Sequence, residues 1–356
     1  MALDRITLAH FRNHPETQLE DTRQINILIG DNGAGKTNIL EALSLLAPGR
    51  GLRRAPLEEV ASTGHDGFAV GADLVPGNAR LGIYTDAGRP GRRLVRINAA
   101  PATGVQLAEW LSVTWLTPAM DGLFTGTASG RRQFADRLAV ALDPLHAAHA
   151  SRYAAAMQER GRLLASDAPV EAAWFDGVER LMAEHGAALA RGRAALIDAL
   201  NNELAAVPDG PFVRPVLTYL ANGPQDAAAL HAALGANRQD DLRAGRTLIG
   251  PHRDELAVTL AAKNMPAARS STGEQKAMLI AIVLAHAGLA ARGRPSVLLL
   301  DEIAAHLDPV RRVALFERLL AGQGQVWMTG TERAPFDPVA QQAAVWQVAH
   351  GRVARV

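Results

Sequence analysis

The stretch Gly30-Asp31-Asn32-Gly33-Ala34-Gly35-Lys36-Thr37 fits the pattern G-x-x-x-x-G-K-[ST] of a phosphate-binding loop. It follows an apolar run of strand length, residues 24–29, and precedes residues 38–46, whose apolar side chains recur at helical spacing. Glycines let the backbone aim successive N–H groups at phosphate oxygens, and a helix N-terminus adds partial positive charge. This strand, loop and helix predict an α/β domain that binds ATP through Gly30 to Asn38.

Two side chains of the loop have predicted roles of their own. Lys36 is expected to reach the β- and γ-phosphates, and Thr37 is expected to offer its hydroxyl to Mg²⁺. A second motif, residues 297–302, is an apolar run that ends in Asp301 and Glu302. Because the carboxyl ends of parallel strands face the nucleotide crevice, Asp301 is predicted to hold Mg²⁺. Glu302 is predicted to act as the general base on the attacking water, so Glu302 and Lys36 are the catalytic candidates.

A third element, Ser270 to Lys276, lies between these two motifs and precedes an apolar helix. Small polar residues and a glycine at a helix start form an N-cap that can also hold an anion. An ordinary capped helix is the alternative interpretation. The position of the element upstream of Asp301 is typical of the signature sequence of ABC-type ATPases.

Composition excludes several classes of protein. The 356 residues include no cysteine, which rules out disulfides, thiolate metal sites and thiol catalysis. No apolar run is long enough for a membrane span and no secretory signal is visible, so the cytoplasm is the expected compartment. The net charge is +1 at pH 7, so any contact with nucleic acid must use local patches.

The middle of the chain differs in character from its two flanks. Residues 131–166 and 171–207 are rich in good helix formers, and Pro144, Pro169 and Pro208 predict several helices. Alternation of strands and helices returns after residue 240. We therefore predict a discontinuous ATP-binding domain, residues 1–120 and 240–356, with an inserted, mainly helical lobe at residues 121–239.

Taken together, these motifs resemble the ABC-type ATPases of chromosome maintenance, and most of all the RecF family. The segments that carry the resemblance are the phosphate loop, His10-Phe11-Arg12-Asn13, Gly130 to Asp136, Gly250-Pro251-His252-Arg253-Asp254, Ser271 to Lys276, and Ala305-His306-Leu307-Asp308. The sequence departs from the family pattern at Ala119-Met120-Asp121, where a glutamate is usual, at Arg160-Gly161, where an Arg-Asn pair is usual, and at Thr272.

The resemblance implies an ABC-type head, a mixed sheet with flanking helices, split by an inserted helical domain. It implies that Arg12 and Asn13 contact ATP and that Asp308 belongs to the D-loop. It also implies a head-to-tail dimer formed on ATP binding, in which the signature motif of one subunit closes over the nucleotide of the other. The signature residues are Ser271, Thr272, Gly273, Glu274 and Lys276.

The resemblance further implies weak, DNA-stimulated ATP hydrolysis and binding to gapped or junction DNA. The expected partners are RecR and RecO, with which the family loads RecA in recombinational repair and the SOS response. Arginine clusters are candidates for phosphate contacts, although a solvated surface is the alternative for each: Arg53-Arg54, Arg131-Arg132, and Arg92-Arg93 with Arg96. Because only 4% of the residues are aromatic, contact with the duplex backbone is favoured over stacking on single-stranded bases.

Three other classes of protein are considered. A transporter ATPase would have its acidic strand much closer to the phosphate loop, and an SMC-like clamp would need long heptad arms. A nuclease with an ABC head would need a further cluster of carboxylates or histidines. For residues 250–254 two interpretations stay open: a structural turn with an internal Arg–Asp pair, or a role near the nucleotide or the dimer interface.

Overall fold

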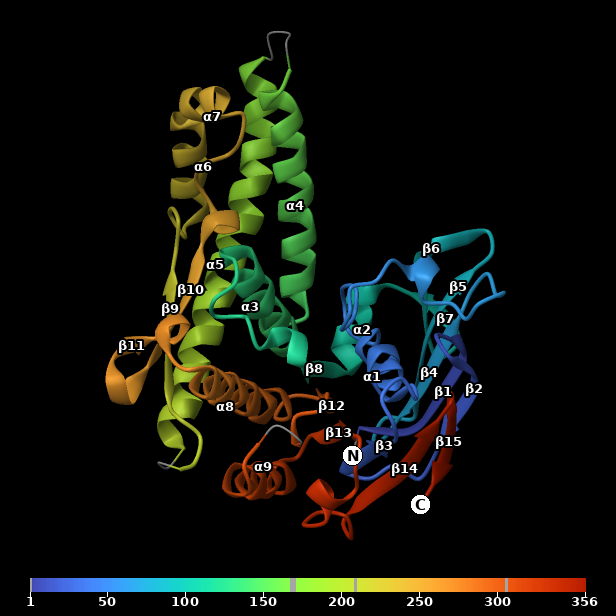
Figure 1. Cartoon of the computed structure of the whole chain (residues 1–356). Helices are drawn as coiled ribbons and strands as arrows, with labels where there is room; N and C mark the ends of the chain where they lie inside the picture. Colours follow the sequence, from blue (N-terminus) through green and yellow to red (C-terminus); the bar gives the residue numbers. More distant parts are fainter. Residues whose placement is uncertain (1, 167–170, 208–209, 305–306) are drawn as a thin grey trace. The chain divides into compact units, whose positions relative to one another are not determined.

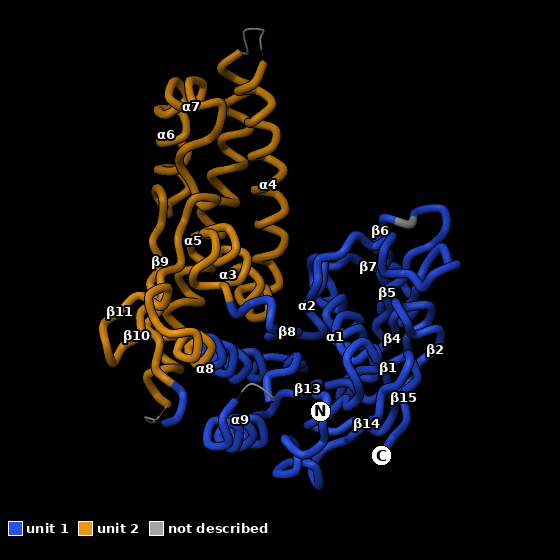
Figure 2. The backbone as a smooth tube through the Cα atoms, in the orientation of Figure 1, with its two compact units in different colours: residues 1–121, 209–212, 279–356 blue, residues 122–208, 213–278 orange. Residues whose placement is uncertain are grey.

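The computed structural model describes residues 2–166, 171–207, 210–304 and 307–356. The chain forms two compact units, shown in Figures 1 and 2. Unit 1 comprises residues 1–121, 209–212 and 279–356, and unit 2 comprises residues 122–208 and 213–278. The boundary at which the chain returns from unit 2 to unit 1 lies at residues 278–279, later than the predicted residue 240. The reason is that β9 (Pro215–Leu220) pairs along its whole length with β10 (Glu255–Leu260), which keeps β10 in unit 2.

Unit 1 contains an antiparallel six-stranded sheet in the order β2-β1-β4-β5-β6-β7. Buried residues alternate with exposed ones along β4 and β5, as expected for a sheet with one face in solvent. The bounds of its strands are β1 Leu3–Phe11, β2 His14–Leu19, β4 Ala69–Leu74, β5 Ala79–Asp86, β6 Arg89–Ile97 and β7 Ala100–Ala102.

A second six-stranded sheet has the order β15-β14-β3-β13-β12-β8, and all its pairs are parallel except that of β14 with β15. Strands β3, β8, β12 and β13 are buried at every position, which explains why apolar residues dominate them. The bounds are β3 Ile25–Ile29, β8 Ser112–Leu116, β12 Ser296–Leu300, β13 Gln325–Gly330, β14 Ala343–Ala349 and β15 Arg352–Arg355.

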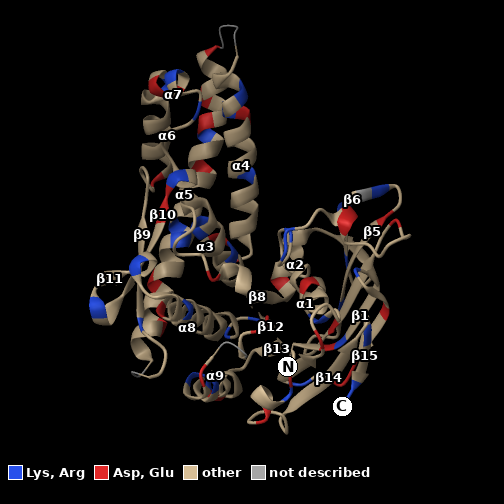
Figure 3. Ribbon diagram, viewed as in Figure 1, with Lys and Arg blue, Asp and Glu red and all other residues tan. Residues whose placement is uncertain are grey.

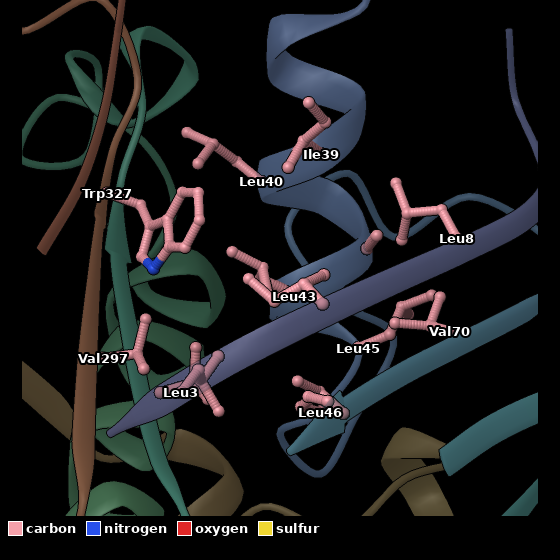
Figure 4. Close-up of a cluster of buried hydrophobic side chains, with 14 of the residues drawn as sticks. Leu3, Leu8, Ile39, Leu40, Leu43, Leu45, Leu46, Val70, Val297 and Trp327 are labelled. Atoms are coloured by element: carbon pink, nitrogen blue, oxygen red, sulfur yellow. The ribbon is translucent and has the colours of Figure 1, made fainter. Parts of the chain in front are cut away.

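Helix α1 (Lys36–Ser44) joins the two sheets into one core. Figure 4 shows its side chains between Trp327 of the second sheet and Leu8 of the first. Buried Gln325 ties the sheets together directly, because its side chain accepts from Leu3 N at 3.1 Å and donates to Leu3 O at 2.7 Å. The remaining helices of this unit are α2 (Gly104–Trp110), α9 (Pro309–Ala321) and the later part of α8 (Thr272–Ala290).

Unit 2 is mainly helical, with a three-stranded sheet in the order β11-β10-β9, where β11 is Met265–Pro266. Pro144 separates its first two helices, as the sequence predicted. The bounds of its helices are α3 Ala128–Leu142, α4 Leu145–Leu164, α5 Ala172–Ala206, α6 Ala227–Ala236 and α7 Arg238–Ala244, and α8 also begins in this unit. No helix among the described residues has the length and apolar character needed to cross a lipid bilayer.

A fully buried arginine, Arg160 of α4, connects three helices of unit 2. Its guanidinium donates to Glu179 Oε1 of α5 at 3.0 Å from two nitrogens, and to Asp241 Oδ2 of α7 at 2.6 Å. A further bond reaches Thr247 Oγ1 at 2.8 Å. Buried charges need partners of this kind, because each lost partner leaves an uncompensated ion.

The segment Gly250 to Asp254 is mostly structural. Buried Asp254 accepts from Arg193 Nη1 at 3.0 Å, from Asn222 N at 2.7 Å and from the Tyr219 hydroxyl. Asp254 thus pairs with an arginine of α5 and not with its neighbour Arg253, whose side chain is exposed.

His252 is held by two further bonds within unit 2. Its Nε2 donates to Thr247 O at 3.0 Å, so its Nδ1 accepts from the Tyr153 hydroxyl at 2.8 Å. Burial lowers the pKa of His252, and the Thr247 carbonyl offsets that effect in part. These contacts support the structural interpretation for the motif, with Arg253 as its solvent-facing member.

We predict that Arg160→Met lowers the free energy of unfolding by about 3–5 kcal/mol, because Glu179 and Asp241 lose a buried partner. Urea unfolding followed by circular dichroism measures the change. The matched control is Arg162→Met on the same helix, whose side chain is 65% exposed and pairs with Glu159. This control should cost about 0–1 kcal/mol. Equal costs for the two variants would contradict the role given to Arg160.

Candidate nucleotide-binding site

The phosphate loop and the acidic strand end share one pocket in unit 1, although they lie far apart in the sequence. Strands β3 and β12 both flank β13, so the segments that follow them meet at the same edge of the sheet. The pocket is lined by Asn32, Gly33, Gly35, Lys36, Thr37, Asn38, Arg53 and Glu302. The structure therefore brings together the loop and the predicted general base.

The glycines of the loop are required by close contacts as well as by backbone angles. Gly35, at the N-cap of α1, has φ 117°, and a Cβ there would lie 2.6 Å from His14 Nε2. A Cβ at Gly30 would lie 2.1 Å from the carbonyl oxygen of Val348. Lys36 is 4% exposed, and its ammonium donates to Gly30 O at 2.6 Å and to Asp31 O at 2.9 Å. The loop thus wraps around a positive charge.

Three groups hold the back of the loop. The carbonyl of Ala34 accepts from Asn13 Nδ2 and from Gly351 N, each at 3.0 Å. The carbonyl of Gly35 accepts from His14 Nε2 at 3.0 Å. In a planar trans peptide the C=O and N–H groups point in opposite directions. Tying these carbonyls behind the loop therefore turns the N–H groups of Gly35 and Lys36 toward the pocket.

His14 is fully buried in this arrangement. Burial lowers its pKa, and the Gly35 carbonyl offsets that effect in part. Its Nδ1 lies 2.9 Å from Thr17 Oγ1, whose hydroxyl is 3.3 Å from Gly351 O. Neither His14 nor Gly351 was found from the sequence, since both act through contacts that join distant segments. A glycine in the turn of the β14–β15 hairpin was the one available signal.

The acidic strand end is organised by a residue that the sequence analysis did not single out, Thr329 of β13. Asp301 Oδ1 accepts from Thr37 Oγ1 at 2.9 Å and from Thr329 Oγ1 at 2.8 Å. Thr329 Oγ1 in turn accepts from the backbone N–H of Glu302 at 2.9 Å. One threonine hydroxyl on the middle strand therefore positions both carboxylate-bearing residues. Its signal in the sequence was its place at the end of a short strand-like run, residues 325–329.

The oxygens at this edge fit a magnesium ion. Thr37 Oγ1 and Asp301 Oδ1 are adjacent, and hard oxygen ligands beside nucleotide phosphates are what Mg²⁺ prefers. Glu302 lines the pocket with φ 54°, a left-handed conformation that costs a non-glycine residue about 1–3 kcal/mol. Such strain is typical of functional positions, and here it accompanies the placement of the Glu302 side chain at the pocket.

Arg12 and Asn13 lie behind or beside the loop and make contacts within the protein. Arg12 forms a two-pronged bond to buried Glu41 of α1, at 2.6 and 3.0 Å. Asn13 accepts from Asn38 Nδ2 at 2.7 Å as well as bracing Ala34. Their direct contact with ATP stays a prediction.

Four of the seven arginines proposed for DNA have different surroundings. Arg53 lines the nucleotide pocket and donates to Asn38 Oδ1 at 2.6 Å. Arg131 forms a two-pronged ion pair with Glu255, at 2.7 Å for both bonds. Arg132 donates to the carbonyl of Asp254 at 2.8 Å, whereas Arg54 is exposed. DNA contact by these residues stays a prediction.

The signature segment starts helix α8 in unit 2. Ser271 and Glu274 form reciprocal bonds: Ser271 N donates to Glu274 Oε2 at 2.9 Å, and Glu274 N donates to Ser271 Oγ at 3.3 Å. Lys263 and then Ser271 lower the pKa of Glu274 to about 2. Glu274 is thus engaged as a cap, while Ser271, Thr272 and Gly273 are exposed.

The predicted D-loop is described in part. Asp308 caps α9 and accepts from Arg311 N at 2.9 Å. Ala305 and His306 lie outside the described residues.

Sequence comparison relates the chain to known proteins over almost its whole length. A family model described as the RecF/RecN/SMC N terminal domain matches residues 2–353. The chain is 45% identical to the DNA replication and repair protein RecF of Mesorhizobium japonicum, over 99% of this chain and 97% of that protein. It is 44% identical to the RecF protein of Agrobacterium fabrum, over 99% and 98%.

Structural comparison supports the same fold. A solved structure of the recombination mediator protein RecF-ATPrS in the RecFOR pathway matches with a TM-score of 0.87 at 19% identity, over 99% of this chain and 98% of that one. The Smc head domain of Pyrococcus furiosus matches with a TM-score of 0.56 at 15% identity, over 100% and 96%. The predicted ABC-type head, a mixed α/β fold with a helical insertion, is therefore confirmed.

We predict that Gly351→Ala weakens ATP binding by about tenfold or more, because the loss of one hydrogen bond and the shift of the loop act together. The added Cβ would lie 1.8 Å from Asn13 O, and φ at this position is 75°. Titration with a fluorescent ATP analogue measures the affinity. Gly77→Ala is the control, since it also has a positive φ, 123°, but meets nothing within 4 Å. If Gly351→Ala binds the analogue as tightly as Gly77→Ala, the hairpin does not support the loop.

Proposed function

The chain belongs to the RecF family, and on that basis we propose that it is an ATP-dependent switch that engages gapped or junction DNA in replication and recombinational repair. The observation that carries the proposal is the shared pocket, in which the phosphate loop, the Thr37–Asp301 pair and Glu302 meet. A pocket with these parts binds and hydrolyses ATP. The arms expected of an SMC-like clamp are not seen among the described residues, where the longest helix, α5, has 35 residues.

ATP would be held mainly by the loop backbone. The N–H groups that face the pocket donate to phosphate oxygens, and the Lys36 ammonium exchanges its bonds to Gly30 O and Asp31 O for bonds to phosphate oxygens. Thr37 and Asp301 would hold Mg²⁺, which neutralises charge on the phosphates when bound. Glu302 takes the proton of the attacking water, and the Thr329 hydroxyl fixes the backbone N–H of Glu302 during that step.

The ATP-bound state is proposed to be a head-to-tail homodimer. The exposed hydroxyls and N–H groups at the start of α8, at Ser271, Thr272 and Gly273, suit the γ-phosphate held by a second copy. A γ-phosphate that contacts both subunits favours the closed state only until hydrolysis, so ATP sets the lifetime of the dimer.

The proposed role in DNA repair is based on the relatives of this chain. These relatives are known as DNA replication and repair proteins and as a recombination mediator of the RecFOR pathway. We propose that this chain likewise works with RecR and RecO to help load RecA, in the cytoplasm, with slow hydrolysis that DNA stimulates. The alternative is an ABC-type ATPase without the mediator role.

We predict that Glu302→Gln traps an ATP-bound dimer, because the amide binds at the pocket but does not accept the proton of the attacking water. Size-exclusion chromatography with light scattering, with ATP and Mg²⁺ present, should show the doubled mass. The Lys36→Arg variant should stay monomeric under the same conditions. A Glu302→Gln protein that elutes only as a monomer would rule out the head-to-tail model.

We predict that gapped DNA raises the wild-type rate of ATP hydrolysis several-fold and is retained in the presence of ATP. Duplex, single-stranded and gapped substrates of equal length are compared by phosphate release and by fluorescence anisotropy. Lys36→Arg should lose both the hydrolysis and the ATP-dependent part of DNA binding. Unchanged hydrolysis together with no retention of any DNA would leave the ABC-type ATPase without a mediator role as the better proposal.

A further inference from the structure

The outward face of the antiparallel sheet in unit 1 has a hollow of about 710 Å³. Its floor is a row across the sheet in which Thr7 lies opposite Gly71, Gly71 opposite Gly82, and Gly82 opposite Arg96. The solvent face of an antiparallel sheet usually carries long polar side chains. Here the two central strands, β4 and β5, carry none in this row, so the floor is open backbone at Gly82, while the Thr7 hydroxyl lies over Gly71.

The walls of the hollow carry stacked π-systems and positive charge. The Arg96 guanidinium lies 4.9 Å from the centroid of the Tyr84 ring. His10 and His65 are stacked with their centroids 3.7 Å apart. Arg80 also lines the hollow and is 67% exposed. The two lining arginines, Arg80 and Arg96, equal the lining carboxylates in number, which are Asp66 and Asp86, and Arg80 also pairs with Asp73 at 3.5 Å.

We infer that this hollow binds single-stranded DNA, with one or two unstacked bases on the glycine floor. An open floor edged by an aromatic ring, a guanidinium and histidines fits a planar base, and Arg80 and Arg96 suit the adjoining phosphates. Bases in a duplex are already stacked and do not enter such a recess. This inference rests on the proposed DNA-binding function and adds a separate site for the single-stranded arm of a gap.

The inference differs from the expectation of duplex contact drawn from the sequence. Aromatic residues are few, but the fold places Tyr84 beside Arg96 across a β5–β6 pair and adds two histidines from distant positions. The low aromatic content of the sequence therefore did not predict that these rings lie together on one face of the sheet.

A steric variant tests the inference without changing charge. At Gly82 a Cβ would meet only Arg96 atoms at 3.9 Å, so Gly82→Val is accommodated and fills the hollow. The wild-type protein and the variants are titrated into labelled oligo-dT of about ten nucleotides and into a duplex of the same length. Gly82→Val should bind oligo-dT about tenfold more weakly, with duplex affinity unchanged.

Two further variants complete the set. Tyr84→Leu removes the ring and should also weaken binding to oligo-dT but not to the duplex. The control Arg89→Ala lies on the same strand as Arg96 but outside the hollow, and it should match the wild type on both substrates. Thermal melting and ATP hydrolysis without DNA should be the same for all these proteins.

The outcomes separate this inference from the proposed function. If Gly82→Val and Tyr84→Leu bind oligo-dT like the wild type, or lose oligo-dT and duplex equally, the hollow is not a single-strand site. The proposed function survives either result, because gapped DNA still stimulates the wild type. If the wild type binds no DNA of any kind, the proposed function fails and the inference fails with it.

Discussion

The function of this protein depends on the direction of two peptide units in the phosphate loop. Backbone N–H groups bind phosphate only if their carbonyls are satisfied on the other side, since a buried carbonyl without a partner is costly. In this chain those partners are Asn13, His14 and the N–H of Gly351. The loop is therefore shaped by contacts with segments of both sheets, and these contacts reduce the binding energy that is spent on ordering it.

Unit 2 is organised by buried charge in addition to apolar packing. Arg160 joins three helices, and Arg193 joins α3, α5 and the start of β10 through Asp136 and Asp254. Burial opposes ionisation of Asp136, but bonds from His146 and Arg193 outweigh it and lower its pKa to about 2. Such networks tolerate few alternative arrangements, because any shift leaves an ion unpaired. They favour a stiff lobe over an adaptable one.

The sequence alone predicted those parts of the site that lie within one continuous segment of the chain. The phosphate loop, the strand before it and the acidic strand end are each continuous segments with their own periodicity, so their elements were predicted closely. Gly351 and Thr329 were missed because each acts on a segment far away in the sequence.

Residue type alone did not show the partners of charged residues that come from distant parts of the sequence. Arg131, a candidate for a phosphate contact, is paired with Glu255, more than a hundred residues later. The division of the chain at residue 240 failed to account for the pairing of β9 with β10 for the same reason. Periodicity and helix caps can be read from the sequence, whereas a partner from a distant part of the sequence produces no periodic pattern.

The position of β3 between β13 and β14 has a consequence for biosynthesis. The strand that leads into the phosphate loop is made early, yet both of its neighbours come from residues 325–349. At about 5–20 residues per second, the ribosome needs roughly 15–65 s to reach them. During that time the apolar run Ile25–Ile29 has no neighbouring strand to pair with, so other parts of the nascent chain must protect it from solvent. The nucleotide site is therefore among the last parts of unit 1 to form.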